Sequence, residues 1–182
     1  MKDWVDYLLR FLFYIIGKLL ILLLVATLLV FSFMAAKDYM NINVLISDGL
    51  KERANVVLKS EDSATLSQIF DEKYLVRDDR LLDDTYTEYV VRSYLQDIDI
   101  GFKLIMPWQQ KVVVKVSETI TQIDGELPTD SRTEDMTEED INPPDWEGAT
   151  YMVTMERHET AWRITNMEWI SEEPLASLAP TE

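Results

Sequence analysis

The chain has 182 residues, with 17 Lys and Arg against 33 Asp and Glu and a formal net charge of -16 at pH 7. This length suits one membrane anchor and one domain of ordinary size, since a well-buried core needs roughly 100 residues. The acidic excess falls mostly after Ala36 and disfavours nucleic acid as a partner of that part, because phosphates would be repelled. The absence of cysteine excludes disulfides, thiolate zinc sites and cysteine nucleophiles.

An uncharged apolar run from Leu19 to Ala36, LLILLLVATLLVFSFMAA, predicts a transmembrane helix. At about 1.5 Å per residue, this run covers most of a hydrocarbon layer of about 30 Å. Lys18 is expected to lay its stem along the helix and place its ammonium among the headgroups. We therefore predict a short N-terminal tail over residues 1–10 and a membrane helix over residues 11–38. Representative anchor residues are Leu19, Leu23, Leu28, Phe31 and Ala36.

A cleaved signal peptide is the competing interpretation of the same run. Its apolar region would span about 7 to 15 residues, with small residues at both positions -3 and -1 before the cut. A cut after Ala36 places Met34 at -3, so an uncleaved anchor is favoured. Basic residues are nearly balanced close to the two ends of the run, and a short tail is the easier part to retain in the cytoplasm. We predict a single-pass protein of the cell membrane, with a cytoplasmic N-terminus and an extracytoplasmic C-terminal domain.

Two helices are expected next. Apolar residues recur at intervals of three and four from Met40 to Leu58, which predicts an amphipathic helix that continues the membrane helix as a stalk. The polar stretch SEDS at residues 60–63 has N-cap chemistry, and the apolar residues that follow it predict a short helix over residues 64–70.

Four strands are expected after the helices. β-Branched and aromatic residues from Tyr86 onward predict a long strand, whose alternation slips near Gly101 in a way that suggests a bulge or bend. Clean alternation over residues 111–121 predicts the second strand. Residues 151–157 and 161–170 predict the last two, joined by the short turn HETA.

Two segments read as irregular. Residues 123–148 are rich in acid, Pro and Thr and poor in aliphatic side chains, which predicts a long, mobile acidic loop. Residues 171–182 contain Pro174 and Pro180 and are expected to form a disordered tail.

The order of elements, helices before an antiparallel sheet of about four strands, defines an α+β fold. The chain resembles the NTF2-like (cystatin-like cone) superfamily at the helix 64–70 with Tyr74-Leu75 after it, at the PWQ turn of residues 107–109 leading into VVVKVSETI, and at the final AWRITNMEWI. The resemblance covers roughly residues 42–170. It implies a helix pair in the concavity of a strongly bent sheet, so that residues 39–170 form an extracytoplasmic NTF2-like domain.

Membrane-anchored members of this superfamily look like assembly components of conjugation and type IV secretion machines. Similar anchored domains occur among cell-envelope and sporulation proteins of Gram-positive bacteria. The resemblance therefore implies a docking module with a protein partner in the envelope, or self-association, and it carries over no common binding residue.

Motifs for nucleotide binding, zinc hydrolysis, serine hydrolysis and kinase chemistry are absent from the sequence, so we expect neither enzymatic activity nor a cofactor or metal. His158, the only histidine, is expected at an exposed strand end. Family enzymes place an acid and a tyrosine inside the cone. Residues that could correspond, unless they lie on the outer face, are Tyr94, Asp97, Asp99, Glu118 and Glu168.

Glu118 shares the parity of the inward-facing valines before it and is expected to point into the fold. A buried carboxylate needs a partner, for which Arg163 or Arg92 is expected. Structural pairing is favoured over catalysis.

The acidic loop lacks the ligand spacing of an EF-hand, so a solvated loop is favoured over a calcium site. Possible interaction residues in it are Trp146, Glu138 and Asp140. Trp146, isolated after NPPD, either docks to a partner or packs back on the sheet.

Three functions compete. The first is a non-enzymatic, membrane-anchored interaction module of a bacterial cell-envelope complex of the conjugation, secretion or sporulation type. The alternative is a tethered cone that binds a small apolar ligand or acts as an enzyme. The third is a small subunit whose transmembrane helix carries the function.

Overall fold

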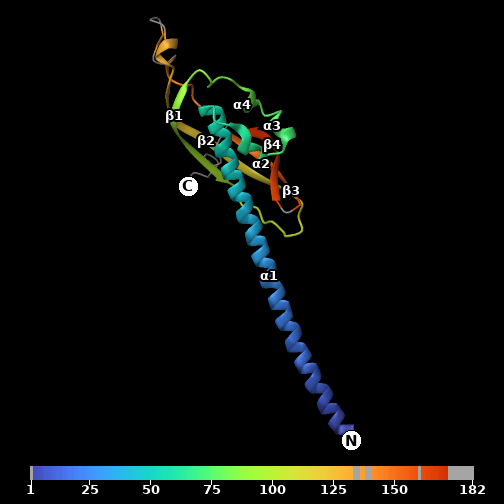
Figure 1. Ribbon diagram of the computed structural model, residues 1–182. Helices are drawn as coiled ribbons and strands as arrows, with labels where there is room; N and C mark the ends of the chain where they lie inside the picture. The colour runs from blue at the N-terminus through green and yellow to red at the C-terminus, as the bar shows by residue number, and fades with distance from the viewer. Residues whose placement is uncertain (1, 133–135, 138–140, 160, 172–182) are drawn as a thin grey trace. The chain divides into compact units, whose positions relative to one another are not determined.

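The computed structural model describes residues 2–132, 136–137, 141–159 and 161–171 (Figure 1). The chain divides into two compact units: Met1–Met40 with Leu104–Trp108, and Asn41–Lys103 with Gln109–Glu182. The predicted disordered tail, apart from Ser171, lies outside the described residues, as do Glu138 and Asp140.

One helix, α1, runs unbroken from Lys2 to Lys59, so the predicted tail of residues 2–10 is helical as well. None of its most apolar 18-residue stretch is buried, and the helix is long and apolar enough to cross a membrane, although a signal sequence would have the same character. The anchor residues Leu19, Leu23, Leu28, Phe31 and Ala36 are all exposed.

α1 ends where Ser60 adopts a left-handed backbone with a φ of 53°. This conformation turns the chain out of the helix, and the N–H of Glu61 donates to the carbonyl of Asn55 at 3.5 Å. The amphipathic helix predicted up to Leu58 is therefore present and belongs to α1.

Three single-turn helices follow: α2 (Leu66–Ile69), α3 (Glu72–Leu75) and α4 (Asp79–Leu82). An aspartate precedes α3 and α4, and its side chain accepts the N–H two residues further on, as an N-cap residue does. The helix predicted over 64–70 is shorter than expected: a 3-10 turn, Ser63–Thr65, precedes α2, and Phe70 already pairs with Ile164 as an isolated bridge.

The sheet has four antiparallel strands in the order β1-β2-β3-β4, namely β1 (Val90–Ile100), β2 (Lys111–Glu126), β3 (Ala149–His158) and β4 (Ala161–Ser171). Every strand has a hairpin neighbour next to it in the chain, and β1 and β4 form the two edges. The predicted α+β class with an antiparallel sheet of about four strands is confirmed.

The irregularity in β1 is not where the sequence placed it. The register shifts lie between Val91 and Leu95, and pairing is regular from there to Ile100. Leu95 explains the misplaced irregularity, because it is an apolar residue on the exposed face. In the sequence it breaks the apolar–polar alternation at a point from which the strand pairing is in fact regular. Gly101 ends the strand, with its N–H bonded to the carbonyl of Lys115 at 2.8 Å.

The loop predicted over 123–148 is partly ordered. β2 continues to Glu126, a 3-10 turn covers Thr129–Ser131, and the N–H of Leu127 donates to the carbonyl of Ile141 at 2.9 Å. Leu127 and Trp146 are both buried. The predicted loop therefore starts later than residue 123, because β2 runs on to Glu126. A few apolar side chains of the loop pack into the fold although its average composition is polar.

The core of the second unit lies between α1 and one face of the sheet (Figure 1). The helix buries one stripe with the three-and-four spacing of an amphipathic helix, and β2 buries alternate residues. Buried members of the two sets are Ile42, Ile46, Leu50, Ala54, Leu58, Val112, Val114, Val116 and Ile120.

Gly49 allows α1 to approach its neighbours closely. A Cβ atom there would lie 2.9 Å from Cγ2 of Ile69, 3.2 Å from Cδ1 of Ile164 and 3.2 Å from Cε2 of Phe70. Gly17, on the same helix, has nothing within 4 Å of such an atom. The two glycines therefore form a matched pair for testing the packing.

Gly49→Val is expected to lower the free energy of unfolding of the second unit by roughly 1–3 kcal/mol, because the added methyls overpack the contact. Gly17→Val should change it by less than about 0.5 kcal/mol, as exposed substitutions do. Near-UV circular dichroism during denaturant titration in detergent measures both. Equal effects of the two substitutions would contradict this packing.

Candidate functional site: a buried arginine between two carboxylates, and the pocket beside it

Arg53 lies on the buried stripe of α1, between the core residues Leu50 and Ala54, and its side chain is only 3% exposed. Its Nε donates to Oδ2 of Asp78 at 2.6 Å and its Nη2 to Oδ1 at 2.6 Å. Such a two-point contact between a guanidinium and a carboxylate is a strong and directional ion pair. Asp78 also accepts the N–H of Arg80 at 3.2 Å, so the residue that begins α4 also pairs with α1.

Glu118 on β2 lies on the other side of the same arginine and is 1% exposed. Its Oε2 is 3.8 Å from Nη1 of Arg53, which is too long for a hydrogen bond. Its Oε1 accepts from Nε2 of Gln96 at 2.7 Å. Within the described part of the chain, Arg53 Nη1 and Glu118 Oε2 have no hydrogen-bond partner.

The inward orientation predicted for Glu118 is confirmed, but both partners expected for it are wrong. Arg92 pairs with Glu126 at an exposed position, and Arg163 stands opposite Glu156 in the sheet. The charge that faces Glu118 comes from α1, far earlier in the chain. The sequence did hold a signal for this partner: Arg53 is a single arginine at a core position of the apolar stripe of α1. Periodicity alone does not show whether such an arginine faces solvent or is buried with a counter-charge.

Burial and pairing act in opposite directions on the charged groups. Burial alone would lower the pKa of Arg53, but the hydrogen-bonded Asp78 outweighs it, and the pKa is raised. Burial raises the pKa of Glu118 above its ordinary value of 4.5, although Arg53 and Gln96 oppose that shift. Since Asp78 already balances Arg53, an ionised Glu118 is an excess negative charge inside the fold.

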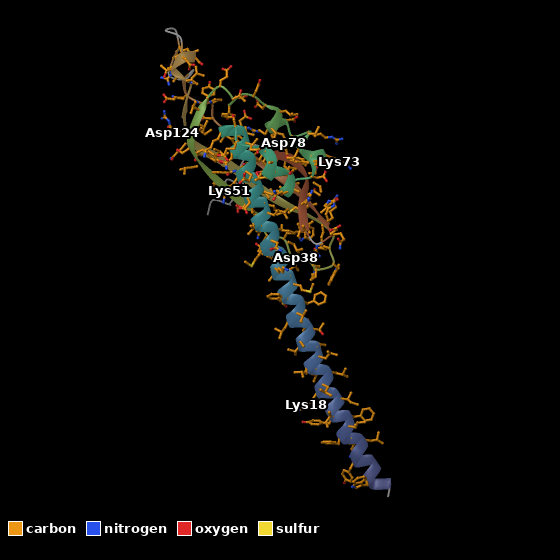
Figure 2. All side chains as sticks on the ribbon, viewed as in Figure 1. Lys18, Asp38, Lys51, Lys73, Asp78 and Asp124 are labelled. Carbon is orange, nitrogen blue, oxygen red and sulfur yellow. The ribbon has the colours of Figure 1, made fainter. Side chains whose placement is uncertain are left out.

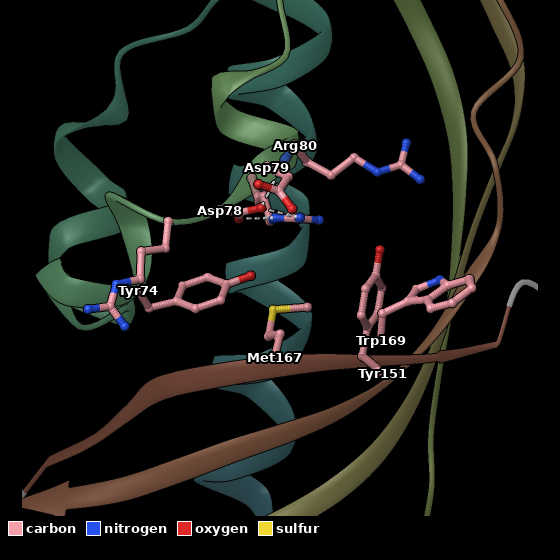
Figure 3. Close-up of a pocket in the computed structure, with 9 residues that line it drawn as sticks. Tyr74, Asp78, Asp79, Arg80, Tyr151, Met167 and Trp169 are labelled. Atoms are coloured by element: carbon pink, nitrogen blue, oxygen red, sulfur yellow. Dashed lines mark hydrogen bonds and ion pairs between the residues drawn. The ribbon is translucent and has the colours of Figure 1, made fainter.

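A pocket of about 220 Å³ opens beside this network. Tyr74 of α3 and Tyr151 of β3 enter it from opposite sides, with Met167 of β4 between them (Figure 3). Burial raises the pKa of both tyrosines, so both hydroxyls stay protonated at neutral pH and can donate hydrogen bonds. The remaining lining residues are Arg53, Arg77, Asp78, Asp79, Arg80 and Trp169.

A second hollow of about 430 Å³ shares Tyr74, Arg77 and Met167 with this pocket and reaches His158. His158 is exposed at the end of β3, as predicted. The acidic residues of this hollow, Asp71 and Glu156, come from the segment before α3 and from β3.

The other acidic residues and the tyrosine predicted to line a cone lie on different faces of the sheet. Tyr94 points inward and its hydroxyl donates to Oδ1 of Asn55 at 2.6 Å, while burial raises its pKa to about 12. Asp97, Asp99 and Glu168 are exposed, which agrees with the outer-face alternative.

Trp146 is buried, so it does not present its ring on the surface as a docking residue would. It lies 5.9 Å from the ring of Tyr86, and the guanidinium of Arg80 lies 4.7 Å from its ring centre. The alternative of packing back on the fold is therefore the observed one. This contact fixes the end of the acidic loop beside α4.

Among the described residues, no group of three or more His, Asp or Glu side chains is arranged to hold a metal ion. Comparison with protein-family models, with curated proteins and with solved structures finds no match to this chain. The site is therefore interpreted from its own chemistry: a cation fixed between two acids, next to a small pocket with two hydroxyl donors and two further arginines.

Glu118→Gln is expected to reduce the pH dependence of stability. Because the folded state holds the Glu118 proton more tightly than the unfolded chain, the wild type loses stability as pH rises above about 4.5, until the folded-state pKa is passed. The glutamine can still accept from Gln96 but has no proton to lose. Unfolding titrations from pH 4.5 to 8 should show the variant gaining on the wild type as pH rises.

Asp78→Asn is the contrasting control, since it removes the hydrogen-bonded counter-charge of the buried Arg53 and leaves only Glu118, 3.8 Å away. The expected cost is about 3–5 kcal/mol of unfolding free energy, as for other broken buried pairs. A constant difference between Glu118→Gln and wild type over the whole pH range would contradict the raised pKa of Glu118.

Proposed function

We propose that the chain is a membrane-anchored, non-enzymatic interaction module of a bacterial cell-envelope complex, with an NTF2-like domain on the extracytoplasmic side. The observation that carries the proposal is the division of α1. Its apolar run from Leu19 to Ala36 is largely exposed, whereas its residues after Met40 form one side of the core of the second unit. The exposed apolar surface of such a helix is removed from water when the hydrocarbon layer of a membrane surrounds its first part.

An anchor also favours an interaction role on energetic grounds. Two partners confined to one membrane meet at a raised effective concentration, so a modest contact is enough to hold them together. The partner is a second envelope protein or another copy of this chain. Conjugation, secretion and sporulation machines are the assemblies that the NTF2-like resemblance suggests.

The edge strand β4 is the part of the second unit best suited to such a contact. Trp169 and Ile170 are large apolar side chains that are exposed on this strand. Phe70 pairs with Ile164 on the outer side of this strand, so the part offered to a partner is the end around Trp169. An exposed strand edge offers unpaired backbone groups to a partner, and tryptophan is among the residue types most enriched at binding hot spots.

A photoreactive amino acid at position 169 is expected to yield one discrete covalent adduct in cells that carry the native gene. The same group at Thr121, an exposed residue of β2, is the matched control and should yield little. Replacing residues 1–36 by an unrelated anchor should preserve the adduct. Its loss would favour the transmembrane helix as the functional part, and the absence of a discrete adduct at 169 would contradict an interaction through β4.

A small anionic ligand is the second candidate, because three arginines line one pocket of a strongly acidic chain. The apolar-ligand version of the cone is disfavoured, since Val114, Trp162 and Ile164, which would line its cavity, are buried in the core. The pocket of about 220 Å³ is smaller than the roughly 300–1,000 Å³ typical of drug-sized ligands. A carboxylate or phosphate compound of few atoms fits this space and these donors.

Inorganic phosphate is therefore expected to raise the thermal midpoint of the full chain in detergent more than chloride does at equal ionic strength. A phosphate concentration ten times its Kd corresponds to about 1.4 kcal/mol of stabilisation. Arg77→Gln should abolish the difference, and Arg92→Gln, at an arginine outside the pocket, should retain it. Identical midpoints in phosphate and chloride would exclude this ligand class.

A further inference from the structure

The connection between β1 and β2, residues 101–110 with the sequence GFKLIMPWQQ, is unusually apolar for a surface loop. Phe102 is 78% exposed, Leu104 57% and Trp108 63%. Loops normally run over the surface with polar side chains. Several large apolar side chains exposed in one short loop mark a contact with another apolar phase, either a membrane or a protein.

The middle of this loop belongs to the same compact unit as the apolar part of α1. Leu104–Trp108 group with Met1–Met40, and the ring of Trp108 meets the ring of Phe31 edge to face, with 5.3 Å between their centres. Phe31 is itself one of the exposed residues of the apolar run. The loop residue Trp108 therefore contacts the helix within its lipid-facing segment.

The charged residues at the two ends of the apolar run indicate the depth of Phe31 in the membrane. Lys18 and Asp38, labelled in Figure 2, lie on α1 at the two ends of a stretch that carries no charge before Lys37. The 20 residue steps from Lys18 to Asp38 correspond to a helix rise of about 30 Å, the thickness of the hydrocarbon layer. Phe31 then lies roughly 10 Å inside the boundary at Asp38, which is the depth that interfacial apolar side chains reach.

We propose that Leu104 and Trp108, the exposed apolar side chains of residues 104–108, insert into the bilayer at the C-terminal end of the membrane helix, as a second and separate contact with lipid. Ile105, which lies between them in the chain, is buried within the protein. The occupant is the boundary between phospholipid headgroups and acyl chains. Tryptophan is enriched at this depth, because its ring is apolar while its N–H can reach a polar partner. The neighbouring Lys103 can extend its ammonium toward the headgroups.

Lipid is favoured over a protein partner because the loop contacts a helix segment that itself has the composition of a membrane span. A protein that covered this loop would have to lie in the bilayer beside Phe31 as well. The proposal rests on the anchoring proposed above, so the experiment must separate failure of the loop from failure of the anchor.

The absence of cysteine permits single-site labelling of the full chain. Three variants, Leu104→Cys, Leu28→Cys and Thr121→Cys, each carry the environment-sensitive fluorophore NBD and are reconstituted in phosphatidylcholine vesicles. Lipids brominated near the carbonyl or near the methyl end of the acyl chain serve as quenchers at two depths. Leu28 reports the anchor, Leu104 the loop, and Thr121 an exposed residue of the sheet.

The expected result is strong quenching at 28 and quenching at 104 that is greater with bromine near the carbonyl end, with no quenching at 121. Quenching at 28 together with a position 104 as unquenched as 121 would overturn the loop insertion and leave the anchor intact. No quenching at 28 would overturn both.

A blue-shifted but unquenched label at 104, whose shift grows with the protein-to-lipid ratio, would identify a second copy of the chain as the occupant and overturn the lipid contact. Adding Trp108→Ser to the Leu104→Cys variant should lower quenching at 104 several-fold while quenching at 28 is unchanged. Unchanged quenching at 104 in this double variant would overturn a role for Trp108 in the insertion.

Discussion

The ion pair between Arg53 and Asp78 is the interaction on which the second unit depends. A guanidinium cannot be left bare in a core, because the cost of removing a charge from water exceeds what packing returns. Burial of Arg53 therefore requires Asp78 to pack against α1. Because Asp78 also accepts the N–H of Arg80, the same contact positions α4. The helices of the segment between α1 and the sheet have only four residues each and are too short to be stable alone. This charged contact therefore holds the segment together with the buried side chains of Leu66 and Phe70.

Glu118 adds an electrostatic cost to the Arg53–Asp78 contact that an isolated ion pair would not have. Two carboxylates face one guanidinium, so full ionisation leaves one buried negative charge. Gln96 offsets part of that cost by donating to Glu118 from β1. The network consequently links α1, α4, β1 and β2 through polar atoms at the centre of an otherwise apolar interface. Such a network specifies one arrangement of the elements more sharply than apolar packing does.

Sequence patterns predicted the elements whose periodicity is uninterrupted and failed where single residues decide. The helix up to Leu58 and the strands predicted from Lys111, Tyr151 and Ala161 follow from repeated spacing, because each turn or pair repeats the same preference. The structure starts the middle one of these strands two residues earlier, at Ala149. Leu95 and Trp146 broke the rule in opposite ways: one is apolar and exposed, the other is an isolated aromatic that is buried. The pairing of Arg53 was beyond any pattern, since it joins residues that only the tertiary fold brings together.

The distribution of cations in so acidic a chain bears on what the pocket can bind. A net charge of -16 repels anions at long range, but salt screens that field within about 8–10 Å. Inside the pocket the nearest charges dominate, and these are Arg53, Arg77 and Arg80 against Asp78 and Asp79. Asp78 engages Arg53, and the ring of Trp146 faces Arg80. Arg77 therefore contributes the charge least committed to the fold, and an anion in this pocket would be recognised by local donors against the field of the whole molecule.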